Sequence, residues 1–219
     1  MLKKYKRLTR KEMKKDPLVL FTAQAAEYLR GEWIKIASII GVVALVVVVA
    51  VVFGQGRKKG EMNAYDAAMT AMQNNAPETT DLLKRVVSKY SGSVSASEAL
   101  IYLGNRYYQQ KDLANSEKCY TEYVKKYASD PVNGFNAYNN LGGIYEEKGD
   151  FKTAAQTYEK YVEKFTNSVF APKMHLNAGK AYLSAKDNEA AKRNFEKITE
   201  NAKDSPEKQE ALAYLELMK

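Results

Sequence analysis

The chain has 219 residues and a formal net charge of +8, and this charge is unevenly spread. Residues 1–35 contain ten Lys or Arg and four acids, whereas residues 60–219 contain 21 basic and 22 acidic residues. A nucleic-acid-binding domain would place its basic residues on the folded face that meets phosphate, so this distribution argues against nucleic-acid binding. One His and one Cys provide no disulfide framework, and neither has neighbours spaced like a metal site or catalytic triad. We therefore predict no enzyme active site, cofactor, metal or small-molecule substrate.

The first predicted element is a basic tail, residues 1–35, that contains an amphipathic helix. Asp16 is a candidate cap and Pro17 suits the first helical turn. Trp33 ends this helix, and it belongs to a residue type that collects at the headgroup level of membranes. A helix lying in the membrane interface is the favoured interpretation, and a docking surface for a cytoplasmic partner is the alternative. The apolar face of the helix consists of Leu18, Phe21, Ala25, Tyr28 and Leu29.

Residues 36–56 are predicted to form a transmembrane helix. Ile36 to Phe53 contains no charged residue, and at about 1.5 Å per residue it covers roughly 27 Å, which residues 54–56 can extend. A cleaved signal peptide is the alternative, but the preceding segment is too long and no A-x-A site follows. We expect the span to remain as an anchor.

Flanking charge predicts the orientation of this anchor. Residues 1–35 carry a net charge of +6, which outweighs the cluster Arg57, Lys58 and Lys59 on the far side. Because the more basic flank stays in the cytoplasm, residues 57–219 should lie across the membrane. The predicted location is a bacterial inner membrane, with a cytoplasmic N-terminus and a periplasmic C-terminal domain.

Residues 57–219 are predicted to form helical hairpins. Residues 61–74 and 80–90 make a first, degenerate pair joined by a turn. The clearest hairpin runs from Leu141 to Tyr161. In it, Gly149 can adopt the left-handed conformation that ends a helix, and Asp150 can cap the next helix. Gly142 lies where the two helices must approach closely, and Tyr158 supplies a large ring.

The hairpin pattern recurs 38 positions earlier and 37 positions later. A fixed period of this length predicts a stacked solenoid, with Glu207 to Met218 as its terminal cap. Five tyrosines fall on packing positions of this pattern: Tyr107, Tyr120, Tyr145, Tyr158 and Tyr182. His175 and Cys119 are likewise interpreted as packing or partly buried residues.

The residue order small-Gly-x-x-Tyr, Gly-Asp-Phe and Ala-x-x-x-Tyr resembles the tetratricopeptide repeat. Lys111 and Lys186 replace the turn glycine in two copies, and the period exceeds the usual 34 or so. The resemblance implies an all-α fold of about three and a half repeats plus a capping helix. It also implies that the first helix of each repeat lines a protein-binding groove.

Carried over by this resemblance, the protein-binding groove consists of Ile101, Asn105, Tyr108, Asn136, Asn139, Asn140, Glu146, Lys173, Asn177 and Lys180. Its abundant amides suit an extended backbone, since an amide can both donate and accept hydrogen bonds. Asn105, Asn140 and Lys173 also match positions of the carboxylate clamp of some tetratricopeptide co-chaperones. Ile101 and Asn177 replace the cations of that clamp, so its strongest charge contacts are missing.

The order of basic tail, single span and repeat solenoid is similar to the YfgM-like family, an ancillary subunit of the bacterial Sec translocon. This resemblance implies a non-enzymatic adaptor that works beside the Sec translocon. Its implied partners are Sec translocon subunits, a membrane-anchored periplasmic chaperone and exported client proteins. The alternative is an envelope scaffold that links an inner-membrane complex to cell-wall or outer-membrane machinery.

Overall fold

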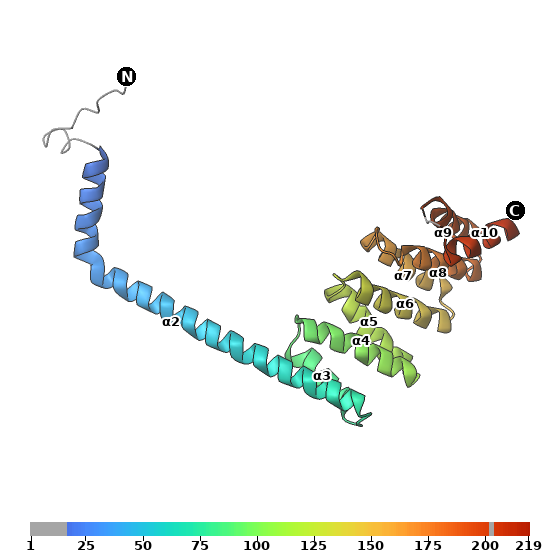
Figure 1. Ribbon diagram of the computed structural model, residues 1–219, viewed down its shortest axis with the longest axis horizontal. Coiled ribbons are helices and arrows are strands. Elements are labelled where there is room, and N and C mark those ends of the chain that lie inside the picture. The colour runs from blue at the N-terminus through green and yellow to red at the C-terminus, as the bar shows by residue number, and fades with distance from the viewer. Residues whose placement is uncertain (1–16, 202–203) are drawn as a thin grey trace, which may run out of the picture. The chain divides into compact units, whose positions relative to one another are not determined.

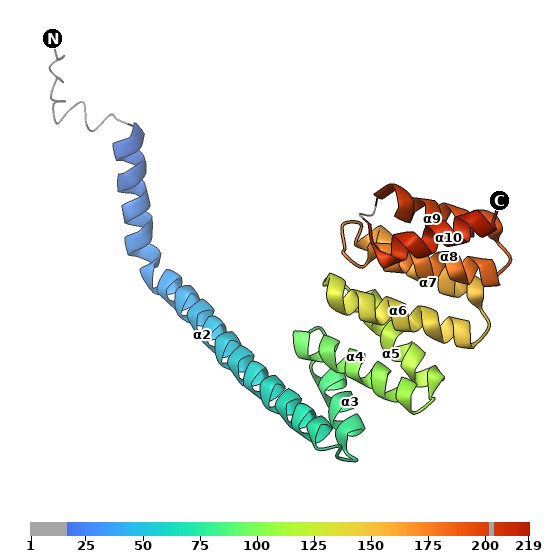
Figure 2. The ribbon, with the colours of Figure 1, turned by 45° about the vertical axis from the view of Figure 1, so that its right-hand side comes forward.

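The computed structural model describes residues 17–201 and 204–219, and this part of the chain is helical without strands. It divides into two units, which meet between Lys59 and Gly60. The helices are α2 (Pro17–Gln73), α3 (Thr79–Lys89), α4 (Val94–Gln109), α5 (Leu113–Lys126), α6 (Pro131–Glu147), α7 (Phe151–Lys164), α8 (Ala171–Ser184), α9 (Asn188–Asn201) and α10 (Pro206–Leu217) (Figures 1 and 2).

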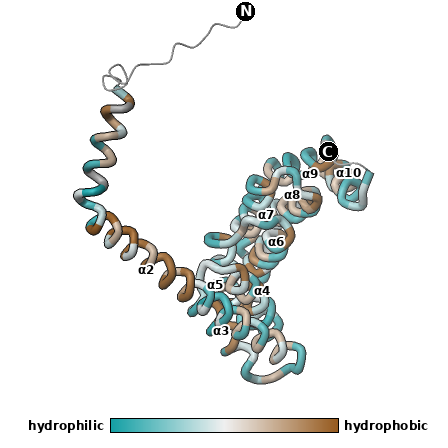
Figure 3. The backbone as a smooth tube through the Cα atoms, turned by 60° about the vertical axis from the view of Figure 1, so that its left-hand side comes forward, coloured by the Kyte–Doolittle hydropathy of each residue, from teal (hydrophilic) through white to brown (hydrophobic). Residues whose placement is uncertain are grey.

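The first unit is formed by the N-terminal part of α2. From Arg30 onward, α2 is the one helix among the described residues that is long and apolar enough to cross a membrane, by length and composition. Its most apolar window has no residue buried in protein, and Figure 3 shows this run as a brown stretch of the tube. The cap expected at Asp16 lies outside the described residues. Leu18, Phe21 and Trp33 are exposed.

The sequence predicts a new helix beginning at Glu61, but α2 continues without a break from Pro17 to Gln73. The three glycines at positions 54, 56 and 60 do not end it. A glycine costs a helix only about 1 kcal/mol relative to alanine, and no proline lies in this stretch to interrupt the hydrogen bonds. Thus the helix that carries the apolar stretch also supplies the first helix of the solenoid.

The second unit, Gly60–Lys219, is the solenoid. Its hairpins pair α4 with α5, α6 with α7, and α8 with α9, while α3 follows the end of α2 across a turn, and each helix from α3 onward packs on the next. α10 packs on α8 and α9 and closes the series. The predicted cap helix and the turn at residues 74–77 are therefore confirmed.

The turn chemistry predicted for the hairpins is present in each of the three best-formed copies. Gly149 has φ = 77°, and Lys111 and Lys186 hold the equivalent position with φ = 62°. The following aspartate caps the second helix each time: Asp112, Asp150 and Asp187 accept from the backbone N–H of Asn115, Thr153 and Ala190 at 3.1, 3.2 and 3.0 Å.

Each of these hairpins has a glycine where its helices approach most closely. A Cβ added to Gly104 would lie 2.7 Å from Cε1 of Tyr120, and Gly142 and Gly179 face Tyr158 and Phe195 more closely still. The glycine leaves the space that the ring fills. This confirms the small-to-large pairing expected of Gly142 and Tyr158.

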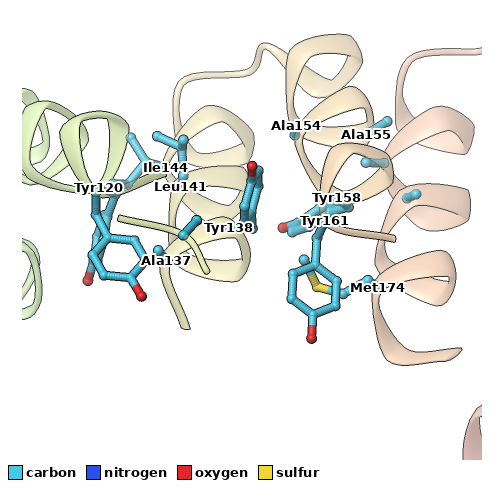
Figure 4. Packing of buried hydrophobic residues seen from close by; sticks show 14 of the residues in the cluster. Tyr120, Ala137, Tyr138, Leu141, Ile144, Ala154, Ala155, Tyr158, Tyr161 and Met174 are labelled. Atoms are coloured by element: carbon cyan, nitrogen blue, oxygen red, sulfur yellow. The ribbon is translucent and has the colours of Figure 1, made fainter. Parts of the chain in front are cut away.

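One hydrophobic core runs through the hairpins from Ala68 to Ala211. Tyr120 and Tyr161 are fully buried, and Figure 4 shows their rings among the side chains that α6 presents to its neighbours. Of the tyrosines expected to pack, Tyr120, Tyr158 and Tyr182 are buried, while Tyr107 and Tyr145 are half-buried against the core. Among the described residues, each buried side-chain nitrogen or oxygen has a hydrogen-bond partner.

Candidate protein-binding groove

The first helices of three successive hairpins, α4, α6 and α8, bring polar side chains to one face. These side chains surround a pocket of about 380 Å³. Seven of the ten residues predicted for the groove line it. The lining consists of Tyr108, Asn139, Asn140, Gly143, Glu146, Tyr158, Lys173, Asn177 and Lys180.

Amide side chains connect neighbouring repeats across this face. Nδ2 of Asn177 on α8 donates to Oδ1 of Asn139 on α6 at 2.9 Å. Nδ2 of Asn140 donates to the hydroxyl of Tyr120 at 3.0 Å and to Oδ1 of Asn105 at 3.3 Å. A primary amide has two N–H donors and two acceptor lone pairs, so the bond between Asn139 and Asn177 uses only part of their capacity. These two residues can still bind a peptide backbone.

Asn105 lies beneath the groove wall. Its Oδ1 accepts from the hydroxyl of Tyr120 at 2.7 Å as well as from Asn140. Tyr120 is fully buried, and burial raises the pKa of its hydroxyl to about 12. Asn105 therefore accepts the hydrogen bond of a buried tyrosine hydroxyl, and it does not line the pocket.

Both acidic and basic groups line the pocket. Burial raises the pKa of Glu146 above its ordinary value, against the opposing effects of a hydrogen bond from Tyr158 and the nearby charge of Lys180. Lys180 forms an ion pair with Glu210 of α10 at 3.1 Å, and this hydrogen bond raises its pKa. Lys173 is exposed at the same rim. The pocket thus offers a half-buried acid on α6 and two ammonium groups on α8.

Tyr108 is held in place at the α4 side of the pocket. Its hydroxyl donates to the carboxylate of Glu147, which raises the pKa of Tyr108. Nζ of Lys111 lies 3.9 Å from the same carboxylate and 5.5 Å from the centre of the Tyr108 ring. The ring is therefore fixed by contacts between two repeats.

Besides Asn105, two further predicted groove residues do not line the pocket. Ile101 is only 6% exposed and belongs to the core, because an apolar residue at this phase of α4 packs between repeats. Asn136 is exposed near the start of α6 and does not line the pocket. The prediction that Ile101 lines the groove is therefore wrong, because its side chain is buried.

Two lining residues were missing from the predicted set. Gly143 has open space where a Cβ would be, so it leaves the pocket floor unfilled. Tyr158 comes from the second helix α7 and reaches Glu146 past Gly142. The pairing of Gly142 with Tyr158, visible in the sequence, was the signal that could have placed Tyr158 at this face.

The single histidine takes part in a buried polar network. Nδ2 of Asn194 donates to Glu159 at 2.8 Å and to the backbone oxygen of Ala190 at 3.0 Å. Its Oδ1 therefore faces Nδ1 of His175 at 2.9 Å, and this nitrogen carries the hydrogen. Burial lowers the pKa of His175. The network supports the packing role expected of His175.

Cys119 is also a packing residue. It is 9% exposed, and burial raises the pKa of its thiol to about 11. A thiol in this state is a poor nucleophile at neutral pH. Among the described residues, no group of three or more His, Cys, Asp or Glu side chains is arranged to hold a metal ion.

Comparison with known proteins agrees with this architecture. One tetratricopeptide-repeat family model matches residues 103–169 and another matches residues 172–205. No curated protein matches the chain.

Several solved structures share the fold. A tetratricopeptide repeat protein from Parabacteroides merdae has a TM-score of 0.58 and 17% identity, covering 73% of this chain and 60% of its own. The MamA protein has a TM-score of 0.51 and 19% identity, covering 70% and 76%. A Podosopora anserina protein with nearly identical TPR-like repeats has a TM-score of 0.52 and 15% identity, covering 72% and 84%. The chain therefore contains tetratricopeptide repeats between residues 103 and 205, within a solenoid of the same fold.

Proposed function

We propose that this protein is a non-enzymatic, membrane-anchored adaptor that holds a segment of another protein on the face formed by α4, α6 and α8. The observation that carries the proposal is the convergence of polar side chains from three successive repeats around one pocket. The partner segment would lie extended, with its backbone bonded to Asn139 and Asn177. Its cationic side chains would face Glu146, and its acidic groups would face Lys173 and Lys180.

The apolar stretch of α2 supports membrane anchoring. In the proposed arrangement, residues 1–35 are a cytoplasmic tail, residues 36–56 cross a bacterial inner membrane, and residues 57–219 lie in the periplasm. The net charge of +6 on residues 1–35 supports this orientation. The similarity in architecture to YfgM-like proteins supports work beside the Sec translocon, with a membrane-anchored periplasmic chaperone and exported chains as partners.

Filling the pocket tests the binding face. Gly143→Leu places an apolar side chain where a Cβ meets no atom of the packed neighbours within 4 Å, so it fills the pocket without an immediate clash at Cβ. The full chain, purified from cells in mild detergent, should lose its co-purifying client proteins by about tenfold or more. The matched control replaces Lys118, Lys152 and Lys192 by alanine, since these exposed side chains lie on the second helices. If the lysine variant loses the partners and Gly143→Leu retains them, the binding face is misassigned.

A photocrosslinker at Met62, which is 58% exposed, tests the Sec assignment in intact cells. Tyr65 is a poorer site because its hydroxyl is bonded to Glu98. Capture of translocon subunits is the expected result. Capture of a different envelope complex, without translocon subunits, would favour the envelope scaffold instead.

A further inference from the structure

Three valines are exposed at the same position of three successive repeats. Val94, Val132 and Val169 are 73%, 53% and 85% exposed. They are separated by 38 and 37 positions, which is the repeat period. Among the described residues between 63 and 211, these are the large hydrophobic side chains that are exposed. Single exposed valines are common on protein surfaces, but a row in register with the repeats is not explained that way.

The valines lie where one hairpin connects to the next. We call this side of the solenoid, formed by residues 90–94, 127–132 and 165–170, the loop edge. The helices that end there carry basic residues in their last turn: Lys89 in α3, Lys125 and Lys126 in α5, and Lys164 in α7. One basic residue at a helix C-terminus is favoured by the helix dipole. The dipole does not explain why several of these lysines converge.

Lysines from two repeats converge beside Val94. Lys125, Lys126 and Lys164 line a pocket of about 420 Å³ together with Val94, and no acid is among its lining residues. Lys126 keeps an ion pair with Glu122 at 2.8 Å. Of the acids near the loop edge, Asp130 is occupied as the cap of α6 and accepts from the N–H of Asn133 at 2.7 Å, while Glu163 is exposed. This part of the loop edge is therefore both apolar and cationic.

The loop edge is also the side at which the chain enters the solenoid. The hydroxyl of Tyr90, at the end of α3, is 3.0 Å from the position that a Cβ on Gly60 would occupy. Gly60 is the first residue of the solenoid, and the preceding residues belong to the same helix as the apolar stretch. Since first and second helices alternate in direction, the starts of α4, α6 and α8 lie on the same side as Gly60. Because only residues 57–59 separate Gly60 from the proposed span, residues 36–56, the chain leaves the bilayer within a few residues of this edge.

We propose that the loop edge docks on the anionic headgroups of the bilayer that α2 crosses. The lysines contact lipid phosphates, and the three valines reach the headgroup level. The inference rests on the proposed membrane anchor and adds a second, reversible contact to it. Each lysine brought close to an anionic surface changes the ratio of docked to undocked protein by about fivefold.

The test uses the full chain, with Cys119 replaced by alanine, in vesicles of phosphatidylcholine alone or mixed with phosphatidylglycerol. A fluorophore is attached to Val132→Cys and, as the control on the opposite side, to Gln110→Cys. Spin-labelled headgroups should quench the probe at residue 132 in the anionic vesicles and leave the probe at residue 110 bright. Quenching should fall at high salt, because screening weakens exposed charge contacts. It should also fall in Lys125→Glu/Lys126→Glu/Lys164→Glu, by more than a hundredfold in docked ratio, because the loss of three lysine contacts alone gives about that factor and the glutamates add repulsion.

Equal quenching at residues 132 and 110, or equal quenching in both lipid mixtures, would overturn the proposal for the loop edge. Extraction with alkaline carbonate checks the anchor separately. A chain that is released by carbonate lacks the anchor, and the loop-edge proposal fails with it. If carbonate does not release the chain but the probe at residue 132 stays bright, the anchor is supported and only the loop-edge contact is refuted. If the same charge reversals also abolish co-purification of a protein, the edge belongs to an acidic protein partner.

Discussion

The ring of Tyr158 occupies the space that a side chain on Gly142 would need, whereas the neighbouring Gly143 faces open space. Gly142→Leu should therefore destabilise the protein by about 1 to 3 kcal/mol, because the helices of this hairpin must separate. Gly143→Ala should stabilise it by about 0.5 to 1 kcal/mol, since alanine is the better helix former. Urea unfolding of the full chain in detergent measures both. Similar effects from the two substitutions would show that α6 and α7 do not pack in this register.

The left-handed lysines predict a stabilising substitution. At φ = 62°, Lys186 has a conformation that costs a residue with a Cβ roughly 1 to 2 kcal/mol, so Lys186→Gly should raise the free energy of unfolding by about 0.5 to 1 kcal/mol. Lys111→Gly would not isolate the backbone effect, because it also removes the contacts of Lys111 with Glu147 and Tyr108. Gly149→Lys is the reciprocal variant and should destabilise. If Lys186→Gly and Gly149→Lys shift stability in the same direction, the turn geometry does not control it.

His175 predicts a pH dependence of stability. Burial lowers its folded-state pKa below the ordinary 6.5, so the unfolded chain binds a proton more readily than the folded one. Its contribution is fully present above pH 6.5, is lost as the pH falls from there through the lowered folded pKa, and then levels off. Denaturation of the full chain at a series of pH values should show this loss. His175→Gln should remove the His175 component while leaving the titration of the acids, and an unchanged curve would contradict the assignment.

The groove amides divide into two classes. Asn105→Ala/Asn140→Ala removes the partners of the buried Tyr120 hydroxyl, and an unsatisfied buried group costs about 1 to 3 kcal/mol. Asn139→Ala/Asn177→Ala removes the two members of one amide pair together, so it should change stability less and weaken client capture more. Tyr120→Phe should rescue part of the stability lost in the first variant. Absence of rescue would mean that this hydroxyl is satisfied by another group.

Topology can be read with a thiol reagent that does not cross the inner membrane. Cys119 is buried, so the natural background should be low. A cysteine at the exposed Lys152 should react in intact cells, whereas one at Lys6, which lies outside the described residues, should react only after lysis. The reverse pattern would place the solenoid in the cytoplasm.

Local chemistry determined what could be predicted from the sequence. The turn at Gly149 and Asp150 and the close approach of Gly142 to Tyr158 depend on residues near each other in the chain, and both are present in the structure. The sequence did not reveal that α2 is unbroken, because the glycines and charged residues at positions 54–60 are typical of a helix end. Neither residue type prevents a helix from continuing.

The candidate site was less predictable because it depends on how repeats stack. Asn139 and Asn177 are 38 positions apart, and only the packing of α6 and α8 determines that their side chains meet. Ile101 was assigned to the groove by its position in the family pattern, yet its apolar side chain is buried in the core. Here the chemistry of the residue was a better guide than its place in the repeat.

The ion pair between Lys180 and Glu210 gives the end of the chain control over the pocket. In a linear stack, each repeat is stabilised only by its neighbours, so unfolding begins most easily at an unprotected end. α10 covers α8 and α9, and its Glu210 holds a lysine at the pocket rim. Cleavage before Pro206 would leave every lining residue in the chain, but it would remove Glu210 and uncover α8 and α9, which would loosen the pocket. A protease acting at the C-terminal end could therefore release a bound segment without reaching the surface that holds it.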